Sequence, residues 1–432
     1  MILKIKVETY GNYYIRDIPE VKNGEINEEW LHKQLIDLYY STISNKKIEP
    51  YKLTYGRNLG YCIVTNANVG ILHSDEITVI IESSVPGLDI GKILYLSSIS
   101  NSSQTYASGK TMETLLNNDL SINTIDYFVV SYLEVLENLI REGLIVNYRK
   151  ENAVKSTPKG RLDIERQVRK SPSYEKYHIK QNVLSTDLII NQVLYKALLV
   201  SLQNTSLKWA IPKLNEFLLH FDDFNDTELE KEDFRLLLDE FTTLPRPDYK
   251  EALILAEHII FGYDPYYGDN YDVFPEYLID MNEVFENYVV NSLIEIFKTG
   301  FHKKYKLSLG LSPNDPKVNE RFIELDGFYQ GDVNIILDTK NKYTGRLSIG
   351  DSFLPTNQDI YQQHYYAQRA DSANVVLIYP YTTRQSKPLS QFKIERYNKE
   401  ITFTCWGLQV TGSPKENQIA MRALAKFIDN LK

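Results

Sequence analysis

The sequence has little cysteine, no long apolar run and no paired histidines, and each absence excludes a class of protein. Cys62 and Cys405 are its only cysteines, and they lie far apart in the chain. This argues against a disulfide framework or a cysteine-based zinc site and favours a reducing compartment, so we expect a cytoplasmic protein. None of the seven histidines has the HExxH spacing of zinc hydrolases.

Apolar residues make up 43% of the chain, enough for sizeable cores, but no run of them approaches the roughly 20 residues that span a bilayer. The first fourteen residues lack the apolar stretch and the cleavage pattern of a signal peptide. We therefore expect no membrane partner.

A sequence of the P-loop type is also incomplete. Residues 108–111 read SGKT, but Gln104 stands where the phosphate-binding loop requires glycine. A single glycine cannot form the tight turn that surrounds a phosphate with backbone amides. We expect this chain not to bind a nucleoside triphosphate by itself.

Charge is unevenly distributed along the chain. The net charge is −9, but residues 301–432 hold 18 Lys and Arg against 13 Asp and Glu, a balance of +5. The first 300 residues hold 30 against 44. The C-terminal third therefore has the sign expected for a polyanion such as DNA, although a mixed solvated surface would show the same modest balance.

Residue patterns divide the chain into three expected domains: a β-rich part at 1–120, a helical part at 121–275 and a mixed part at 276–432. In the first we expect a helix at 27–43 and strands that include residues 92–99. In the second we expect helices at 126–142, 185–203, 207–221 and 245–263, with a polar, basic connector at 147–170. A loop rich in Tyr, Asp and Pro precedes the third domain.

The mixed part has a clear order of expected elements. Asp280 is placed as the N-cap of a helix beginning at Met281. Three strand patterns follow, then a helix at 357–370 and a strongly apolar strand, ANVVLIYP. This α-β-β-β-α-β order predicts an α/β fold with a mixed sheet between helices.

The triplet Asp338-Thr339-Lys340 ends an apolar strand in this unit. Side chains alternate along a strand, so Asp338 and Lys340 are expected on one face. Asp326 ends the preceding strand and can lie beside Asp338 if the two strands form a hairpin. A charged strand end is often only a solvated end, but two carboxylates at one place favour a divalent cation between them. We expect Mg²⁺, or Mn²⁺ in its place, held by Asp326 and Asp338.

Two further residues are expected to support this site. Glu286 lies at the edge of the apolar stripe of the preceding helix, and Gln362 is expected to face the sheet from the following helix. In such a site Lys340 would orient or deprotonate a water that attacks a phosphodiester. The five candidate catalytic residues are Asp326, Asp338, Lys340, Glu286 and Gln362.

Five blocks in this order resemble the McrC family, whose catalytic core is a PD-(D/E)xK nuclease. They are KGRLDIERQV, LSTDLIINQVLYKAL, MNEVFENYVV, LDGFY with ILDTKNKY, and DIYQQHYYA. The resemblance implies a type IV restriction endonuclease subunit that cuts DNA with Asp326, Asp338 and Lys340. It also implies an McrB-like AAA+ GTPase hexamer as partner, stimulated by this subunit and contacted by its N-terminal region.

One departure from the family pattern keeps alternatives open. Leu325 stands where the family usually has proline, so either Asp326 or Asp332 could be the first ligand. The same departure motivates an alternative function, a non-catalytic activator or scaffold of an AAA+ ring with a decayed nuclease fold. A third interpretation is a nuclease that works without a partner.

Overall fold

The computed structural model describes most of the chain in separate ranges. These are residues 3–46, 48–57, 59–74, 76–100, 124–170, 176–221, 224, 246–261, 277–310, 321–342, 348–349, 352–382, 386–396 and 399–431. The SGKT sequence and the loop expected before the third domain lie outside them, apart from the last residues of that loop. Within these ranges, no helix is both long enough and apolar enough to cross a bilayer.

The chain divides into two compact units. The first joins residues 1–124 with 276–432, and the second holds residues 125–275. The two outer parts of the chain therefore share one unit. Whether these outer parts act as separate domains stays a prediction.

The N-terminal part of the first unit contains two sheets. One has the order β1-β6-β5-β10 and the other the order β2-β4-β3. Their strands are β1 (Leu3–Glu8), β2 (Asn12–Tyr14), β3 (Tyr51–Gly56), β4 (Gly60–Thr65), β5 (Asn68–His73), β6 (Ile77–Glu82) and β10 (Tyr277–Asp280). Alternating buried side chains of β1 pack on the expected helix, α2 (Glu28–Lys46), in one apolar core. The short helices η1 (Ile15–Asp17) and α1 (Pro19–Lys22) lie between β2 and α2 in the chain.

The strand expected at 92–99 is wrong, because these residues belong to helix α3 (Ile90–Ser100). A short apolar run does not distinguish a strand from a buried helix. The distinguishing signal is Asp89, whose carboxylate accepts a hydrogen bond from the Lys92 amide at 3.0 Å and so caps the helix. Most of α3 is buried, and it packs against α11 (Met281–Phe297).

The C-terminal part of the first unit contains a six-stranded mixed sheet of order β11-β12-β13-β16-β18-β17. The strands are β11 (Phe301–Gly310), β12 (Arg321–Tyr329), β13 (Ile335–Thr339), β16 (Asn374–Tyr381), β17 (Lys387–Arg396) and β18 (Lys399–Gln409). A small hairpin, β14 (Ser348–Ile349) and β15 (Ser352–Phe353), precedes α12 (Asn357–Arg369). The closing helix is α13 (Pro414–Asp429). The mixed α/β class is as expected.

Helices cover both faces of this sheet. Ala367 of α12 packs with Ile336, Leu377 and Phe403 on one face. The side chains that alternate with these along the strands point to the other face of the sheet. On that face Trp406 of β18 packs near Phe427 of α13, with ring centroids 4.7 Å apart. The central strands β13 and β16 are buried almost throughout, which explains their continuous apolar sequences.

Local capping sets where the helices begin. The Asp280 side chain accepts from the Asn282 amide at 2.9 Å, as the N-cap expectation requires. Thr356 caps α12 and Ser413 forms a capping box with Glu416 at the start of α13. These caps place α11 and α12 at defined positions along the central strands.

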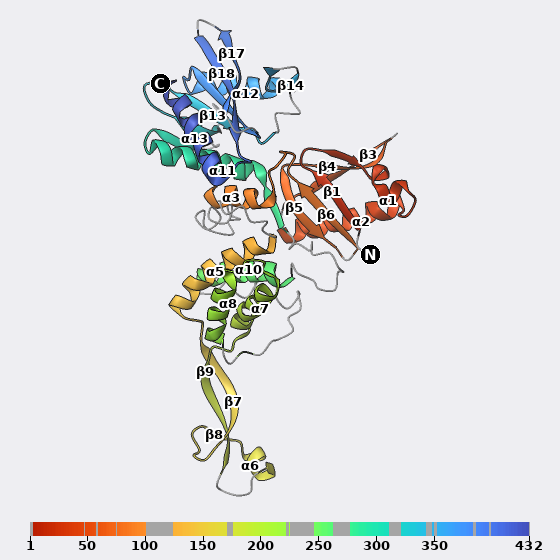
Figure 1. The fold of residues 1–432 in the computed structure, drawn as a ribbon, viewed down its shortest axis with the longest axis vertical. Coiled ribbons are helices and arrows are strands. Elements are labelled where there is room, and N and C mark those ends of the chain that lie inside the picture. The colour runs from red at the N-terminus through yellow and green to blue at the C-terminus, as the bar shows by residue number, and fades with distance from the viewer. Residues whose placement is uncertain are drawn as a thin grey trace. The chain divides into compact units, whose positions relative to one another are not determined.

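The second unit combines a helical bundle with a long β-ribbon. Its helices are α5 (Thr124–Glu142), α7 (Ile189–Asn204), α8 (Ala210–Leu218), η2 (Leu219–Phe221) and α10 (Pro247–Phe261). The connector expected at 147–170 is instead largely structured. Strand β7 (Asn147–Lys155) pairs with β9 (Tyr177–Ser185), and β8 (Arg161–Leu162) and α6 (Ile164–Lys170) lie at the far end of this ribbon (Figure 1). The strands of this ribbon were not predicted from the sequence, because they bury little apolar surface and so lack an apolar pattern.

We expect truncation of the central strand to destabilise the first unit. Leu337 is 1% exposed in β13, so Leu337→Ala should lower the free energy of unfolding by about 2–5 kcal/mol. Calorimetric unfolding measures this loss. Ile419→Ala is the control, since Ile419 is 58% exposed; equal effects of the two changes would contradict the burial of β13.

Candidate metal and phosphodiester site

The candidate site lies where pairing between β12 and β13 stops. These strands are paired at three positions, from Gly327–Leu337 to Tyr329–Ile335, and no pairing is present at Asp326. Beyond Leu337, β13 pairs only with β16 among the described strands. On the side toward β12, backbone groups at the end of β13 therefore need partners other than a neighbouring strand.

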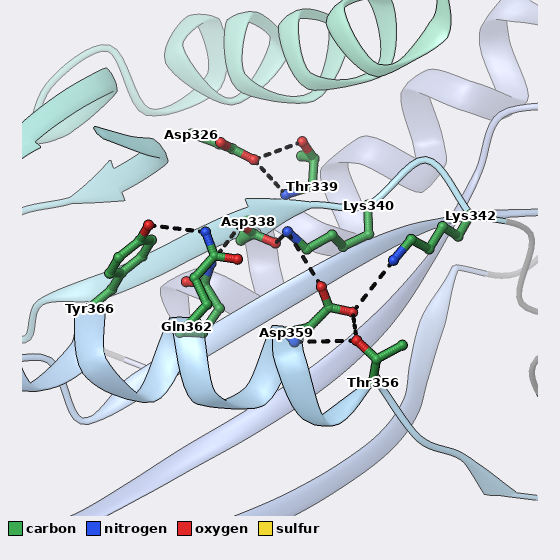
Figure 2. A network of polar contacts seen from close by, with 10 residues as sticks. Asp326, Asp338, Thr339, Lys340, Lys342, Thr356, Asp359, Gln362 and Tyr366 are labelled. Atoms are coloured by element: carbon green, nitrogen blue, oxygen red, sulfur yellow. Dashed lines mark hydrogen bonds and ion pairs between the residues drawn. The ribbon is translucent and has the colours of Figure 1, made fainter. Parts of the chain in front are cut away.

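Asp326 supplies one such partner. Its Oδ2 atom accepts hydrogen bonds from the Thr339 amide at 2.9 Å and from the Thr339 hydroxyl at 3.0 Å (Figure 2). Asp326 is thus tied to the residue that stands between Asp338 and Lys340. The hairpin geometry expected from the sequence brings this carboxylate to the end of β13.

Asp338 and Lys340 contact each other directly. The Lys340 ammonium lies 2.8 Å from Asp338 Oδ2, and the Lys340 amide donates to the Ile378 carbonyl at 2.9 Å. Asp338 is 6% exposed. Its Oδ1 atom accepts from the Gln363 amide at 2.7 Å, whereas Oδ2 has the ion pair but no hydrogen bond of regular geometry.

Burial and neighbouring charges shift the pKa values of the site's acid and amine. Burial and the nearby Asp326 raise the pKa of Asp338 to about 7, although Lys340 opposes this shift. Burial lowers the pKa of Lys340, but Asp338 and Asp359 raise it by more, so the net shift is upward. Burial and like charge therefore favour the neutral form of Asp338, whereas the surrounding acids favour the protonated form of Lys340.

Glu286 belongs to the same electrostatic cluster. It lies on α11 and is half-buried. Burial and Asp326 raise its pKa to about 7, with Lys304 and Lys303 opposing the shift. Glu286 is therefore coupled to Asp326 through their charges, and no hydrogen bond or ion pair joins it to Asp338 or Lys340 among the described residues.

Gln362 does not face the sheet as expected. It is exposed on α12 and its amide donates to the Tyr366 hydroxyl at 3.0 Å. Its neighbour Gln363 is 1% exposed and reaches Asp338. Neighbouring side chains of a helix are rotated by about 100° about its axis, so Gln362 and Gln363 point in different directions. The sequence alone does not show which of the two faces the sheet. Whether Gln362 has a role in catalysis stays a prediction.

Asp359 lies in the site although it was not among the expected site residues. It is 7% exposed, and its oxygens lie 3.8 Å from the Lys340 ammonium and 3.8 Å from the Lys342 ammonium (Figure 2). Asp332, the alternative first ligand, is exposed between β12 and β13 and has no contact with this network among the described residues. The signal for Asp359 is Thr356-x-x-Asp359, a helix-start pattern that fixes the direction of an acid.

The residues present fit a magnesium-type ion. Carboxylate oxygens are its usual ligands, and the buried Asp338 Oδ2 has no regular hydrogen bond. A bound cation would also favour the ionised carboxylates, which burial and mutual repulsion disfavour. Among the described residues, no group of three or more His, Cys, Asp or Glu side chains is arranged to bind a metal ion by itself. Water and substrate oxygens would therefore complete the shell, as is usual for Mg²⁺.

Comparison with known proteins then identifies the family. Residues 65–380 match the model of the McrBC 5-methylcytosine restriction system component. The chain belongs to the McrC family of this system. A comparison with curated proteins finds no match.

A solved structure at TM-score 0.56 shares the overall fold of this chain. It is described as a refined half-complex from a tetradecameric assembly of Thermococcus gammatolerans McrB AAA+ hexamers with bound McrC. It matches with a TM-score of 0.56 and 16% identity over 98% of this chain and 100% of that chain. The Thermococcus gammatolerans McrBC complex matches with a TM-score of 0.39 and 18% identity over 68% and 88% of the two chains.

Because the pKa of Glu286 is raised, replacing this carboxylate should increase thermal stability by an amount that depends on pH. An acid whose pKa is raised in the folded state costs stability as the pH rises from its unfolded pKa of 4.5 to its folded pKa of about 7. Glu286→Gln should therefore raise the Tm by about 1–4 °C at pH 8 in chelator, and by little at pH 5. Differential scanning calorimetry at the two pH values measures this difference.

Glu295→Gln is the matched control, because Glu295 is exposed on the same helix. Its effect on the Tm should be the same at both pH values. A pH-independent effect of Glu286→Gln would contradict the electrostatic cluster.

Proposed function

We propose that this chain is the DNA endonuclease subunit of an McrBC-type, type IV restriction system. The reaction is Mg²⁺-dependent hydrolysis of a phosphodiester by water, on a core of the PD-(D/E)xK type. The observation that carries this proposal is the gathering of Asp326, Asp338 and Lys340 at the end of β13. Membership of the restriction-system family and the positive balance of the C-terminal third support it.

Each residue has a distinct part in the proposed reaction. Asp338, through Oδ2, and Asp326 would hold the ion, and Gln363 fixes the orientation of the Asp338 carboxylate. The ion supplies a Lewis acid that stabilises negative charge on the phosphate. Lys340 donates a hydrogen bond to the attacking water and offsets charge that develops in the transition state. Glu286 acts beside Asp326, as a further acid of the same cluster.

Replacing Asp338 or Lys340 by alanine tests the site. Each change should reduce the cleavage rate by at least about 100-fold, because each removes a charge that acts on the reacting phosphate. Folding and partner binding should remain. Supercoiled DNA, Mg²⁺, GTP and a partner ATPase of the McrB type provide the assay, with Asp332→Ala as the control. Cleavage by Asp338→Ala at the parental rate would refute the assignment.

A non-catalytic activator or scaffold of an AAA+ ring remains the second candidate. Leu325 in place of the usual proline favours it, as does the attachment of Asp326 Oδ2 to Thr339. Metal-binding calorimetry separates the two functions. A decayed site gives no Mg²⁺ or Mn²⁺ heat that depends on Asp326 or Asp338, whereas the nuclease does.

The proposed partner is an McrB-like AAA+ GTPase hexamer whose hydrolysis this chain stimulates. The solved relative, McrC, is bound to McrB AAA+ hexamers. We propose that the partner contacts the N-terminal region, residues 1–120. We propose the end of the ribbon in the second unit as an additional contact surface. There the exposed apolar side chains Ile164 and Val168 stand among basic residues, a combination typical of interaction surfaces.

Acidic substitutions at the ribbon end test this addition. Ile164→Asp with Val168→Asp should reduce stimulation of the partner's GTPase by about 5-fold or more, because charges replace apolar contacts. Ile419→Asp, an exposed apolar position on α13, is the control. Unchanged stimulation by the ribbon variant would restrict docking to residues 1–120.

A further inference from the structure

Asp359 has more contacts than a helix cap requires. It is the third residue of α12, where its amide donates to the Thr356 hydroxyl at 3.2 Å and its Oδ2 atom accepts from that hydroxyl at 2.6 Å. A capping acid is ordinarily solvated. Asp359 is instead 7% exposed, and both of its oxygens face amines that follow β13.

Lys340 lies between two carboxylates. Its ammonium is 2.8 Å from Asp338 Oδ2 and 3.8 Å from Asp359 Oδ1. The lysine side chain is 17% exposed, so it has little access to water as an alternative partner. The short distance shows that Asp338 is its main partner in this arrangement, and Asp359 is the second carboxylate within reach.

The same Asp338 oxygen is the one that a metal ion needs. Gln363 occupies Oδ1 of Asp338, so Oδ2 is left for a cation. The Lys340 ammonium and a divalent ion would therefore compete for one oxygen, and two cations at that distance repel each other. Occupation by the ion requires that the ammonium move away from Asp338 Oδ2.

We propose that Asp359 is a positioning residue that receives the Lys340 ammonium when a divalent cation occupies Asp338 Oδ2. This inference rests on the proposed function. Asp359 keeps the displaced amine paired and beside the site, where it can contact the attacking water. Lys342, which is 42% exposed, can turn into solvent and leave Asp359 to Lys340.

A simpler explanation is that Asp359, as a third acid, attracts the cation directly. The two explanations differ in their dependence on Lys340. A general attraction would act whether or not residue 340 carries a charge. A receiver for the displaced amine matters only while Lys340 is present. The two explanations therefore give different results in a double-mutant cycle.

Mn²⁺ titration calorimetry on the full chain, without DNA, tests the proposal with four proteins: wild type, Asp359→Asn, Lys340→Met and the double variant. Asp359→Asn should weaken Mn²⁺ binding by about 10-fold, a usual effect of residues that support metal ligands. In the Lys340→Met background, Asp359→Asn should change the affinity by less than about 2-fold, because no amine needs a receiver.

Controls separate the proposal from a folding defect. Asn at 359 keeps an oxygen that can accept from Thr356, so α12 should remain capped. Gln358→Ala changes an exposed residue of the same helical turn and keeps both Thr356 and Asp359, so it should leave the Mn²⁺ affinity within about 2-fold of wild type. Thermal unfolding confirms that each variant is folded.

Two outcomes overturn the proposal. An equal loss of affinity from Asp359→Asn in both backgrounds shows general attraction or a structural role, and leaves the proposed nuclease intact. If the wild type gives no Mn²⁺ heat, or if Asp338→Ala gives the same heat as the wild type, both this proposal and the metal-dependent function are removed. A cleavage assay adds a further difference, since Asp359→Asn should lower kcat while changing the KM for DNA little.

Discussion

The end of pairing between β12 and β13 is the constraint on which the candidate site depends. Up to Gly327 and Leu337 the two strands satisfy each other's backbone groups. Beyond this point the Thr339 amide is satisfied by a side chain, that of Asp326. An acid is thereby fixed at the end of the sheet by the ordinary requirement that a buried amide find an acceptor. The placement of the other charged groups follows from this opening.

The second determinant is the helix that covers this end of the sheet. α12 begins at Thr356, and its first turn brings Asp359 toward the amines that follow β13. One turn later Gln363 reaches Asp338. The same helix packs Ala367 into the apolar core, so the packing of its apolar face determines the position of its polar residues.

Much of this was predictable because it depends on local patterns. Apolar strands with a terminal acid and amine identified β13, and the N-cap Asp280 located the start of α11. The mixed sheet followed from the order of the elements. The expectation that Gln362 faces the sheet was wrong, because the rotation of α12 decides which side chain points inward and tertiary packing sets that rotation. Asp359 was missed because its importance comes from residues that are 17 and 19 positions away in sequence. Helix α3 was misread because burial on all sides removes the amphipathic signal.

The connection between β10 and α11 has a consequence for how the chain is made. β10 completes the N-terminal sheet by pairing with β5, and it continues directly into α11. Between β5 and β10 the chain builds the whole second unit. During synthesis the N-terminal sheet therefore stays incomplete, with one edge of β5 unpaired, until about 200 further residues have left the ribosome. Because residues 125–275 form a unit of their own, they can fold while this edge is still open, since domains generally fold as units during synthesis.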